Sequence, residues 1–100
     1  MESLFCYGTL LDPDVQRRVI GRTVESRPDV LPGYRKDTLL LGCASYYIAV
    51  PDSHGEILGG VIEVTQDELL RIDRYEGEEY ERARVTLASG TEAWVYRRPR

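Results

Sequence analysis

The chain has 100 residues, of which 42% are hydrophobic and 30% are charged, and its formal net charge is −4. This size and composition are typical of one globular domain, so we expect residues 1–100 to share a single core and exclude a disordered or fibrous protein. The negative charge comes from the second half, which holds 11 Asp and Glu against 7 Lys and Arg. That balance argues against a nucleic-acid partner.

The sequence lacks the patterns of a membrane protein and of a metalloprotein. Its longest uncharged run has 14 residues, fewer than the roughly 20 apolar residues that span a bilayer. The acidic N-terminal start precedes no long apolar run, so we expect a soluble cytoplasmic protein without a secretion signal. Cys6, Cys43 and a single histidine have no metal-ligand spacing. We therefore expect reduced, buried thiols and neither metal nor cofactor.

The N-terminal segment predicts a buried strand followed by a helix. Residues 4–7 are apolar or aromatic, and Gly8 ends this run in a turn. Asp12 is a favourable N-cap, and Pro13 suits the first helical position, where its missing N–H costs nothing. Gly21 ends the apolar stripe and predicts the end of the helix.

Proline and glycine predict a loop before the next strands. Pro28 and Pro32 interrupt regular structure, so residues 26–33 are expected to form a loop. Residues 34–50 are rich in Leu, Tyr, Ile and Val without a helical period. They predict one or two strands interrupted at Gly42.

A turn and a further strand are predicted after that. Residues 51–55 combine Pro, Asp, Ser, His and Gly, which is typical of a turn. Residues 57–64 are mostly apolar and predict a strand. Within it, Gly59 and Gly60 indicate a bulge or a close approach of another backbone.

The C-terminal part predicts a helix and a hairpin. Thr65 and Glu68 have the spacing of a capping box. Residues 80–87 alternate between two faces, and Ser89-Gly90 turns them into a partner strand at 93–96. With five or six strands and two helices, the fold class is α+β, with a small mixed sheet that is curved or closed into a barrel.

Glu76 departs from the apolar pattern of the second helix. It lies seven residues after Leu69 and four after Ile72, so its carboxylate belongs to the same helix face as these apolar side chains. Partial burial and the negative end of the helix dipole raise a carboxylate pKa, which suits a general base. The alternative is that the helix ends earlier and Glu76 is solvated.

The segment Tyr7-Gly8-Thr9-Leu10 is a second candidate site. A strand that ends at glycine just before a helix leaves backbone N–H groups unpaired. Such groups can bind a carboxylate or a developing oxyanion. The alternative is an ordinary glycine connection between a strand and a helix.

Other residue groups have simpler interpretations than catalysis. Cys6 and His54 lack a third residue that would orient the histidine, so Cys6 is expected to pack in the core. The acidic residues at 76–81 lack the spacing of a calcium loop and suit a solvated turn. Arginines could bind an anionic group, but a solvated surface is the simpler interpretation for Arg82, Arg84 and the tail Arg97-Arg98-Pro99-Arg100. The remaining aromatic side chains are expected to pack the core and its edges: Tyr34, Tyr46, Tyr47, Tyr75, Tyr80 and Trp94.

Three spaced motifs resemble the gamma-glutamylcyclotransferase-like family, and in particular its small gamma-glutamylamine cyclotransferase-like members. They are Tyr7-Gly8-Thr9-Leu10, Leu31-Pro32-Gly33-Tyr34-Arg35, and Ile72-Asp73-Arg74-Tyr75-Glu76-Gly77 followed by Tyr80-Glu81-Arg82. The chain departs from the family pattern at Tyr46-Tyr47, where relatives usually have a Tyr/Phe-Pro step. This departure affects the expected cavity wall and hence the substrate.

The resemblance implies an α+β barrel with a cavity at its mouth and an enzyme that releases 5-oxoproline from a gamma-glutamyl amide without a cofactor. Glu76 then corresponds to the acid/base residue, residues 7–10 to the substrate-binding loop, and Tyr80 to an aromatic residue bordering the cavity. We expect Glu76 and the Gly8–Leu10 amides to line one cavity, because both ends of the reacting group must be held at once.

Two alternatives to this enzyme remain. The first is a relative of the same fold that acts on another amide or binds a metabolite without turnover, and a binder without turnover would have no need of a carboxylate base in the cavity. A protein-interaction module would show a contiguous exposed apolar patch instead of a cavity. The leaving amine and the oligomeric state cannot be read from the sequence.

Overall fold

The computed structural model describes residues 1–99, and Arg100 of the basic tail lies outside the described residues. Within the described chain, five strands form one curled sheet in the order β2-β3-β1-β5-β4. The elements in chain order are β1 (Glu2–Cys6), the short 3-10 helix η1 (Thr9–Leu11), α1 (Pro13–Ile20), β2 (Arg27–Leu41), β3 (Ala44–Val64), α2 (Gln66–Glu76), β4 (Glu81–Thr86) and β5 (Glu92–Arg97).

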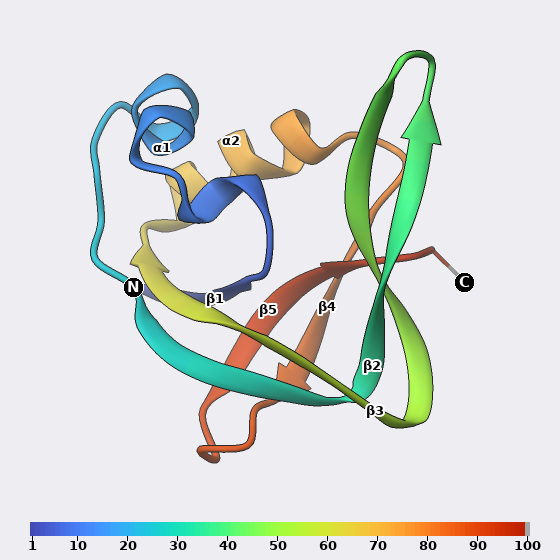
Figure 1. The fold of residues 1–100 in the computed structure, drawn as a ribbon. Helices are drawn as coiled ribbons and strands as arrows, with labels where there is room; N and C mark the ends of the chain where they lie inside the picture. Colours follow the sequence, from blue (N-terminus) through green and yellow to red (C-terminus); the bar gives the residue numbers. More distant parts are fainter. Residues whose placement is uncertain (100) are drawn as a thin grey trace.

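β3 curls the sheet, because its two halves pair with different strands. Its C-terminal half pairs antiparallel with β1, whereas Ala49 in its N-terminal half lies opposite Arg97 of β5. β1 also pairs with β5, so β1, β3 and β5 surround a common interior. The predicted α+β fold with a curved mixed sheet is therefore confirmed, and Figure 1 shows α1 and α2 together on one side of this sheet.

Strand β1 separates two parts of the hydrophobic core. Its side chains alternate between the two faces of the sheet. Leu4 and Cys6 pack toward the helices, where they meet Leu69 and Ile72 of α2. Phe5 faces the interior of the curled sheet, among a cluster that includes Leu31, Ile57 and Val95. This double burial explains the continuous apolar run at residues 4–7.

Both predicted helix starts are confirmed. The Asp12 carboxylate accepts a hydrogen bond from the N–H of Asp14 at 2.8 Å, with Pro13 at the first helical position. At α2, the Thr65 hydroxyl accepts from the N–H of Glu68, and the Glu68 carboxylate accepts from the N–H of Thr65. These bonds satisfy amides that the helices cannot pair internally.

The prediction of a loop at residues 26–33 is wrong, because these residues belong mostly to β2. β2 is an edge strand that pairs with β3 alone, and an edge strand tolerates Pro28 and Pro32 because one side of its backbone needs no partner. The irregularity is confined to a bulge between Pro32 and Tyr34, where Gly33 has a φ of 82°.

The predicted turn at residues 51–55 does not separate two strands. β3 continues through it, with Pro51 opposite Tyr34 and Glu56 opposite Pro32. The extra residues on β3 are the counterpart of the bulge at Gly33, so turn-forming residues here bend one long strand. The predicted interruption at Gly42 is confirmed as the turn of the β2–β3 hairpin.

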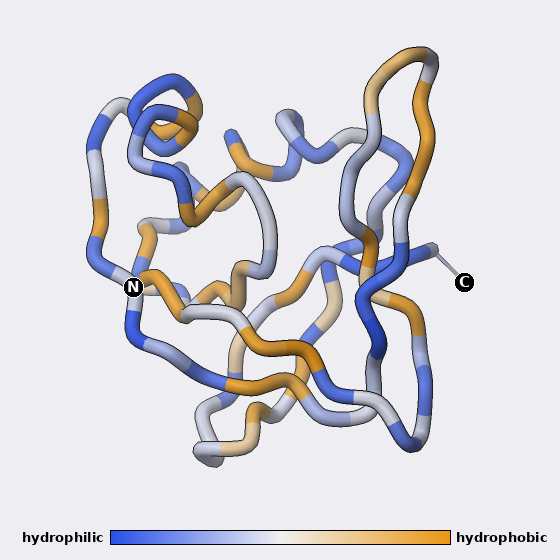
Figure 2. The backbone as a smooth tube through the Cα atoms, in the orientation of Figure 1, coloured by the Kyte–Doolittle hydropathy of each residue, from blue (hydrophilic) through white to orange (hydrophobic). Residues whose placement is uncertain are grey.

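The end of this hairpin stands away from the rest of the molecule (Figure 1). Residues 40–47 are all exposed. Figure 2 nevertheless colours much of its β2 arm hydrophobic, in keeping with Leu39, Leu40 and Leu41. The hairpin therefore presents apolar side chains that the hydrophobic core does not use.

Candidate active site

The loop after β1 presents unpaired backbone amides. Gly8 accepts a hydrogen bond from the N–H of Leu11 at 3.2 Å, and Thr9 accepts from the N–H of Asp12 at 2.9 Å, which closes the single turn of η1. The first N–H groups of a helical turn have no acceptor within it. Within residues 1–99, no backbone acceptor is found for the amides of Gly8, Thr9 and Leu10.

Glu76 is the last residue of α2 and is half-buried. Burial raises the pKa of its carboxyl group to about 7. In the described part of the chain, no hydrogen bond or ion pair stabilises its charged form. A carboxyl group that is half-ionised near neutral pH can both accept and donate a proton.

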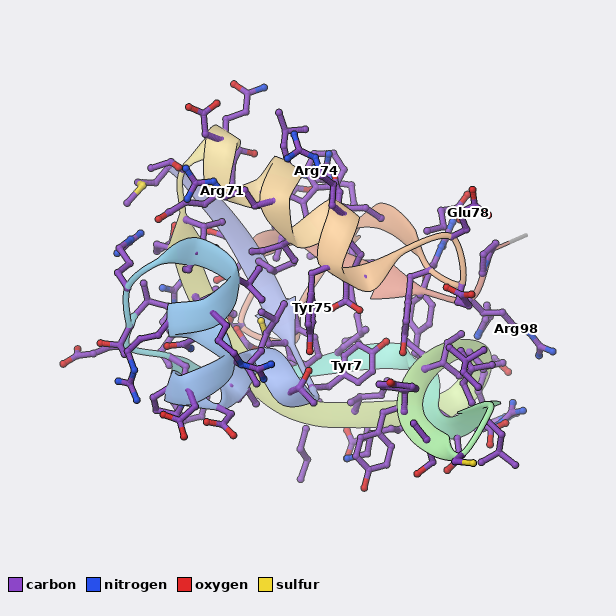
Figure 3. All side chains as sticks on the ribbon, turned by 90° about the horizontal axis from the view of Figure 1, so that it is seen from above. Tyr7, Arg71, Arg74, Tyr75, Glu78 and Arg98 are labelled. Carbon is purple, nitrogen blue, oxygen red and sulfur yellow. The ribbon has the colours of Figure 1, made fainter. Side chains whose placement is uncertain are left out.

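Glu76 and the loop line the same cavity, whose volume is about 600 Å³. The cavity lies where β1, α1, α2 and the β2–β3 hairpin meet. Figure 3 shows Tyr75 reaching from α2 toward Tyr7, whereas Arg71 and Arg74 point away from this region. The lining side chains and loop residues are Phe5, Cys6, Tyr7, Gly8, Thr9, Leu10, Arg18, Leu41, Ser45, Tyr46, Tyr47, Tyr75, Glu76, Gly77, Glu79, Tyr80 and Tyr96.

Tyr7 contributes to this cavity and also connects two strands. Its buried hydroxyl donates a hydrogen bond to the carbonyl oxygen of Tyr96 in β5 and accepts one from the N–H of Ala49 in β3, at 3.0 Å. Burial, the largest cause, and the nearby charge of Glu76 raise the pKa of the Tyr7 phenol. Tyr7 therefore stays protonated and holds the wall of the cavity together.

Tyr80 and Tyr75 tie α2 and its following turn to the other cavity walls. The Tyr80 hydroxyl donates to the carbonyl oxygen of Tyr47 at 2.6 Å, and the Tyr75 hydroxyl forms a 2.8 Å hydrogen bond with that of Thr9. Burial and the charge of Glu76 raise the pKa of Tyr80 to about 12. The two phenols thus fix the hairpin and the loop relative to Glu76.

Cys6 and His54 do not form a catalytic thiol–imidazole pair in the structure. Cys6 is buried and its thiol contacts the carbonyl oxygen of Leu4, whereas His54 is exposed on β3 beside Ser53. Burial raises the pKa of the Cys6 thiol, so it stays protonated at neutral pH. Cys43, expected to be buried, is exposed at the hairpin turn.

We therefore expect Cys6→Ser to keep any enzymatic activity within about threefold of the wild type, because a neutral thiol is a poor nucleophile. Iodoacetamide should label Cys43 in the native protein and Cys6 only after unfolding. Mass spectrometry of the labelled protein and a Cys43→Ser control would measure this. A folded Cys6→Ser protein without activity would restore the thiol as a reacting group.

The arginines expected on a solvated surface have definite partners. Arg82 donates to both carboxylate oxygens of Asp73, at 2.9 and 3.2 Å, and its guanidinium lies over the Trp94 ring together with that of Arg84. Arg97, predicted as part of a solvated tail, pairs with Glu81 and donates to the Tyr34 hydroxyl. Arg82, Arg84 and Arg97 are not among the described residues that line the 600 Å³ cavity.

Several lining residues were missed from the sequence. Arg18 lies on α1, where a charged residue on the exposed face gives no functional signal. Tyr46 and Tyr47 were expected to pack in the core or at its edges, but both are exposed and line the cavity. The departure of Tyr46-Tyr47 from the family pattern had pointed to the cavity wall, and both residues line the cavity. Glu79 also lines the cavity.

Neither a metal-binding cluster nor a helix able to cross a membrane is found among the residues that the structure describes. No three His, Cys, Asp or Glu side chains of residues 1–99 gather in a way that would hold a metal. Over the same residues, neither α1 nor α2 has the length and hydropathy that crossing a bilayer requires.

Curated proteins similar to this chain come from Arabidopsis thaliana. AIG2-like protein A is 40% identical over 88 residues, which cover 87% of this chain and 52% of the relative. AIG2-like protein B is 34% identical over 88 residues, which cover 87% of this chain and 50% of the relative. The chain thus spans about half the length of these relatives.

Solved structures share the fold. A solution structure of an Arabidopsis thaliana protein aligns with a TM-score of 0.82 at 35% identity, covering 97% of this chain and 68% of that protein. A gamma-glutamyl cyclotransferase aligns with a TM-score of 0.74 at 18% identity, covering 98% of this chain and 66% of the enzyme. At that identity the second likeness concerns the fold alone.

The family model described as "Gamma-glutamyl cyclotransferase, AIG2-like" matches residues 4–100. This match includes the loop at residues 7–10, the whole of α2 and the terminal hairpin. Because it extends over nearly the entire chain, the protein belongs to the gamma-glutamyl cyclotransferase, AIG2-like family.

Proposed function

We propose that the protein is a gamma-glutamyl cyclotransferase, which releases 5-oxoproline from a gamma-glutamyl amine or amino acid. The observation that carries this proposal is the position of Glu76, a half-buried carboxyl group with a pKa of about 7, in the same cavity as the unpaired amides of Gly8, Thr9 and Leu10. A base and a set of oxyanion donors in one cavity are what an acyl transfer requires.

In the proposed reaction the substrate supplies its own nucleophile. The α-amine attacks the γ-carbonyl carbon, a C–N bond forms to close the five-membered ring, and the bond to the leaving amine breaks. Folding the glutamyl chain in the cavity would bring these atoms together and supply the proximity contribution. The reaction needs no redox cofactor, because no electrons are exchanged with another molecule.

Glu76 would move the protons. The attacking α-ammonium loses two protons on becoming the lactam N–H, and the leaving nitrogen gains two on departing as an ammonium ion. A carboxyl group with a pKa near 7 could accept each proton and deliver it, which is worth about 10²–10⁴-fold in rate. The amides of Gly8 to Leu10 would bind the oxyanion or the substrate carboxylate.

The remaining charged and aromatic groups have supporting roles in this proposal. Arg18 is the cation found among the described lining residues, and it would attract the α-carboxylate of the substrate into the cavity. Tyr7 and Tyr80 would border the bound glutamyl group while their hydroxyls hold Tyr96, Ala49 and Tyr47 in place.

We expect 5-oxoproline to be released when the protein is incubated with gamma-glutamyl amines, gamma-glutamyl amino acids and glutathione as separate substrates. Chromatographic detection of 5-oxoproline would give the rate for each, with boiled protein as the control. Binding of 5-oxoproline without turnover of any of these compounds would identify a metabolite-binding protein instead. If none of these compounds is bound or turned over, the cavity is not a glutamyl site.

A further inference from the structure

The β2–β3 hairpin supplies one wall of the cavity. Four of its residues line the cavity, namely Leu41, Ser45, Tyr46 and Tyr47, and none of them is charged. Leu41, Tyr46 and Tyr47 are 38%, 42% and 52% exposed, so the protein itself leaves much of their apolar surface uncovered. A ligand in the cavity would cover part of this surface.

The wall is held in position before any ligand binds. The Tyr80 hydroxyl donates a 2.6 Å hydrogen bond to the carbonyl oxygen of Tyr47, which anchors the hairpin backbone to the turn after α2. The ammonium group of Lys36 lies 4.4 Å from the centre of the Tyr47 ring, and such a cation–π contact restrains the ring. A preorganised wall loses little conformational entropy when a ligand packs against it.

Charge is distributed unevenly around the cavity. The charged lining residues are Arg18 of α1, Glu76 of α2 and Glu79 of the following turn, while the hairpin contributes only an aliphatic, a hydroxyl and two phenol side chains. The glutamyl group, with its amine and carboxylate, matches the charged walls and the loop amides. The volume of about 600 Å³ is in the range that holds a ligand larger than a glutamyl group alone.

We propose that Leu41, Tyr46 and Tyr47 form a subsite for the leaving amine, and that this subsite selects amines carrying an apolar, preferably aromatic, group; the inference rests on the function proposed above. A cationic leaving group would lose water at this wall without gaining an anionic partner from the hairpin residues that line the cavity. An apolar group would instead exclude water from the exposed faces of the hairpin side chains.

The first test measures binding without turnover. In the Glu76→Gln background, the dissociation constants of gamma-glutamylbenzylamine, gamma-glutamylmethylamine and gamma-glutamylputrescine are compared by titration calorimetry. Covering roughly half of a phenyl group at the wall should make the benzyl compound bind about tenfold more tightly than the methyl compound. The cationic putrescine compound should bind no more tightly than the methyl compound.

Single substitutions in the hairpin test which side chains cause the preference for the benzyl compound. Tyr46→Ser and Tyr47→Ser should each reduce the benzyl-over-methyl ratio to about threefold or less, since each removes an aromatic side chain from a residue that lines the cavity. Leu40→Ser is the control, because Leu40 lies on the same hairpin and is 74% exposed but does not line the cavity. Its ratio should equal that of the parent protein. Thermal unfolding followed by circular dichroism establishes that each variant is folded.

Turnover separates this inference from the function on which it rests. In the wild type, kcat/KM for 5-oxoproline release should show the same benzyl-over-methyl preference. Equal binding of the two compounds, tightest binding of the putrescine compound, or a preference that survives in both tyrosine variants would overturn the subsite. Absence of turnover with every compound would overturn the proposed reaction, while the binding comparison would still decide the subsite.

Discussion

Glu76→Gln is expected to lower kcat for 5-oxoproline release by roughly two to four orders of magnitude. Glutamine preserves the size of the side chain and one acceptor oxygen but neither accepts nor releases a proton at neutral pH. The loop amides of Gly8, Thr9 and Leu10 are untouched by the change, so 5-oxoproline should still bind. A variant that turns over a verified substrate at nearly the wild-type rate would refute the assignment of Glu76.

The pH dependence provides a second readout of the same residue. In the proposed reaction Glu76 must be ionised in the free protein to act as the base, so kcat/KM of the wild type should rise with pH and level off above a pH of about 7. The residual activity of Glu76→Gln should lack this ascending limb at pH 7. An identical limb in both proteins would assign the titration to the substrate or to another group.

Stability should change in the direction opposite to activity. The folded-state pKa of Glu76 is raised above its ordinary value, so folding is penalised once the group ionises, and stability falls as pH rises toward and through about 7. Glu76→Gln removes this penalty. Its melting temperature should therefore exceed that of the wild type more at pH 8 than at pH 5, where Glu76 is already protonated. A difference that is independent of pH would contradict the buried position of the carboxyl group.

Gly59→Ala should lower the melting temperature by roughly 10–20 °C. A Cβ atom at Gly59 would lie 2.3 Å from the carbonyl oxygen of Cys6 and 2.7 Å from the Phe5 ring. The obstacle is backbone of the central strand β1, which cannot move aside as a flexible side chain can. The sequence predicted a bulge or a close approach at Gly59 and Gly60, and the close approach is the one observed.

The control for this variant is the neighbouring Leu58→Ala. Leu58 is 71% exposed on the same strand, so its truncation should change the free energy of unfolding by no more than about 0.5 kcal/mol. Calorimetric melting of the two variants beside the wild type would measure both effects. Equal stability of Gly59→Ala and the wild type would mean that β1 and β3 can separate there without cost.

The sequence predicted the features that depend on neighbouring residues. The capping groups Asp12 and Thr65 act on amides two or three positions away, so their chemistry is visible in the local sequence. The loop expected around Pro28 and Pro32 was wrong because their tolerance depends on the edge position of β2, which is set by strand pairing far along the chain.

The candidate site was predictable to a similar extent. Helical spacing singled out Glu76, and the glycine turn together with the family resemblance singled out residues 7–10. Tyr46 and Tyr47 were linked to the cavity wall only through the family resemblance, and Arg18 was not placed there at all, because its position depends on how α1 is arranged around the cavity. Periodicity reports which face of an element is apolar, but it does not report which elements meet.

Because the hairpin is exposed, the residues that shape this wall of the cavity are different from the residues that hold the fold together. Residues 40–47 contribute little to the core, whereas β1 and α2, which carry the loop and Glu76, are buried on the faces that hold the fold together. Most substitutions in the hairpin would therefore alter the cavity wall at a small cost in folding free energy. Directed evolution could diversify Leu41, Tyr46 and Tyr47 together and screen for new ligands, while Glu76 and the loop at residues 7–10 stay unchanged in a scaffold that does not need to be stabilised again.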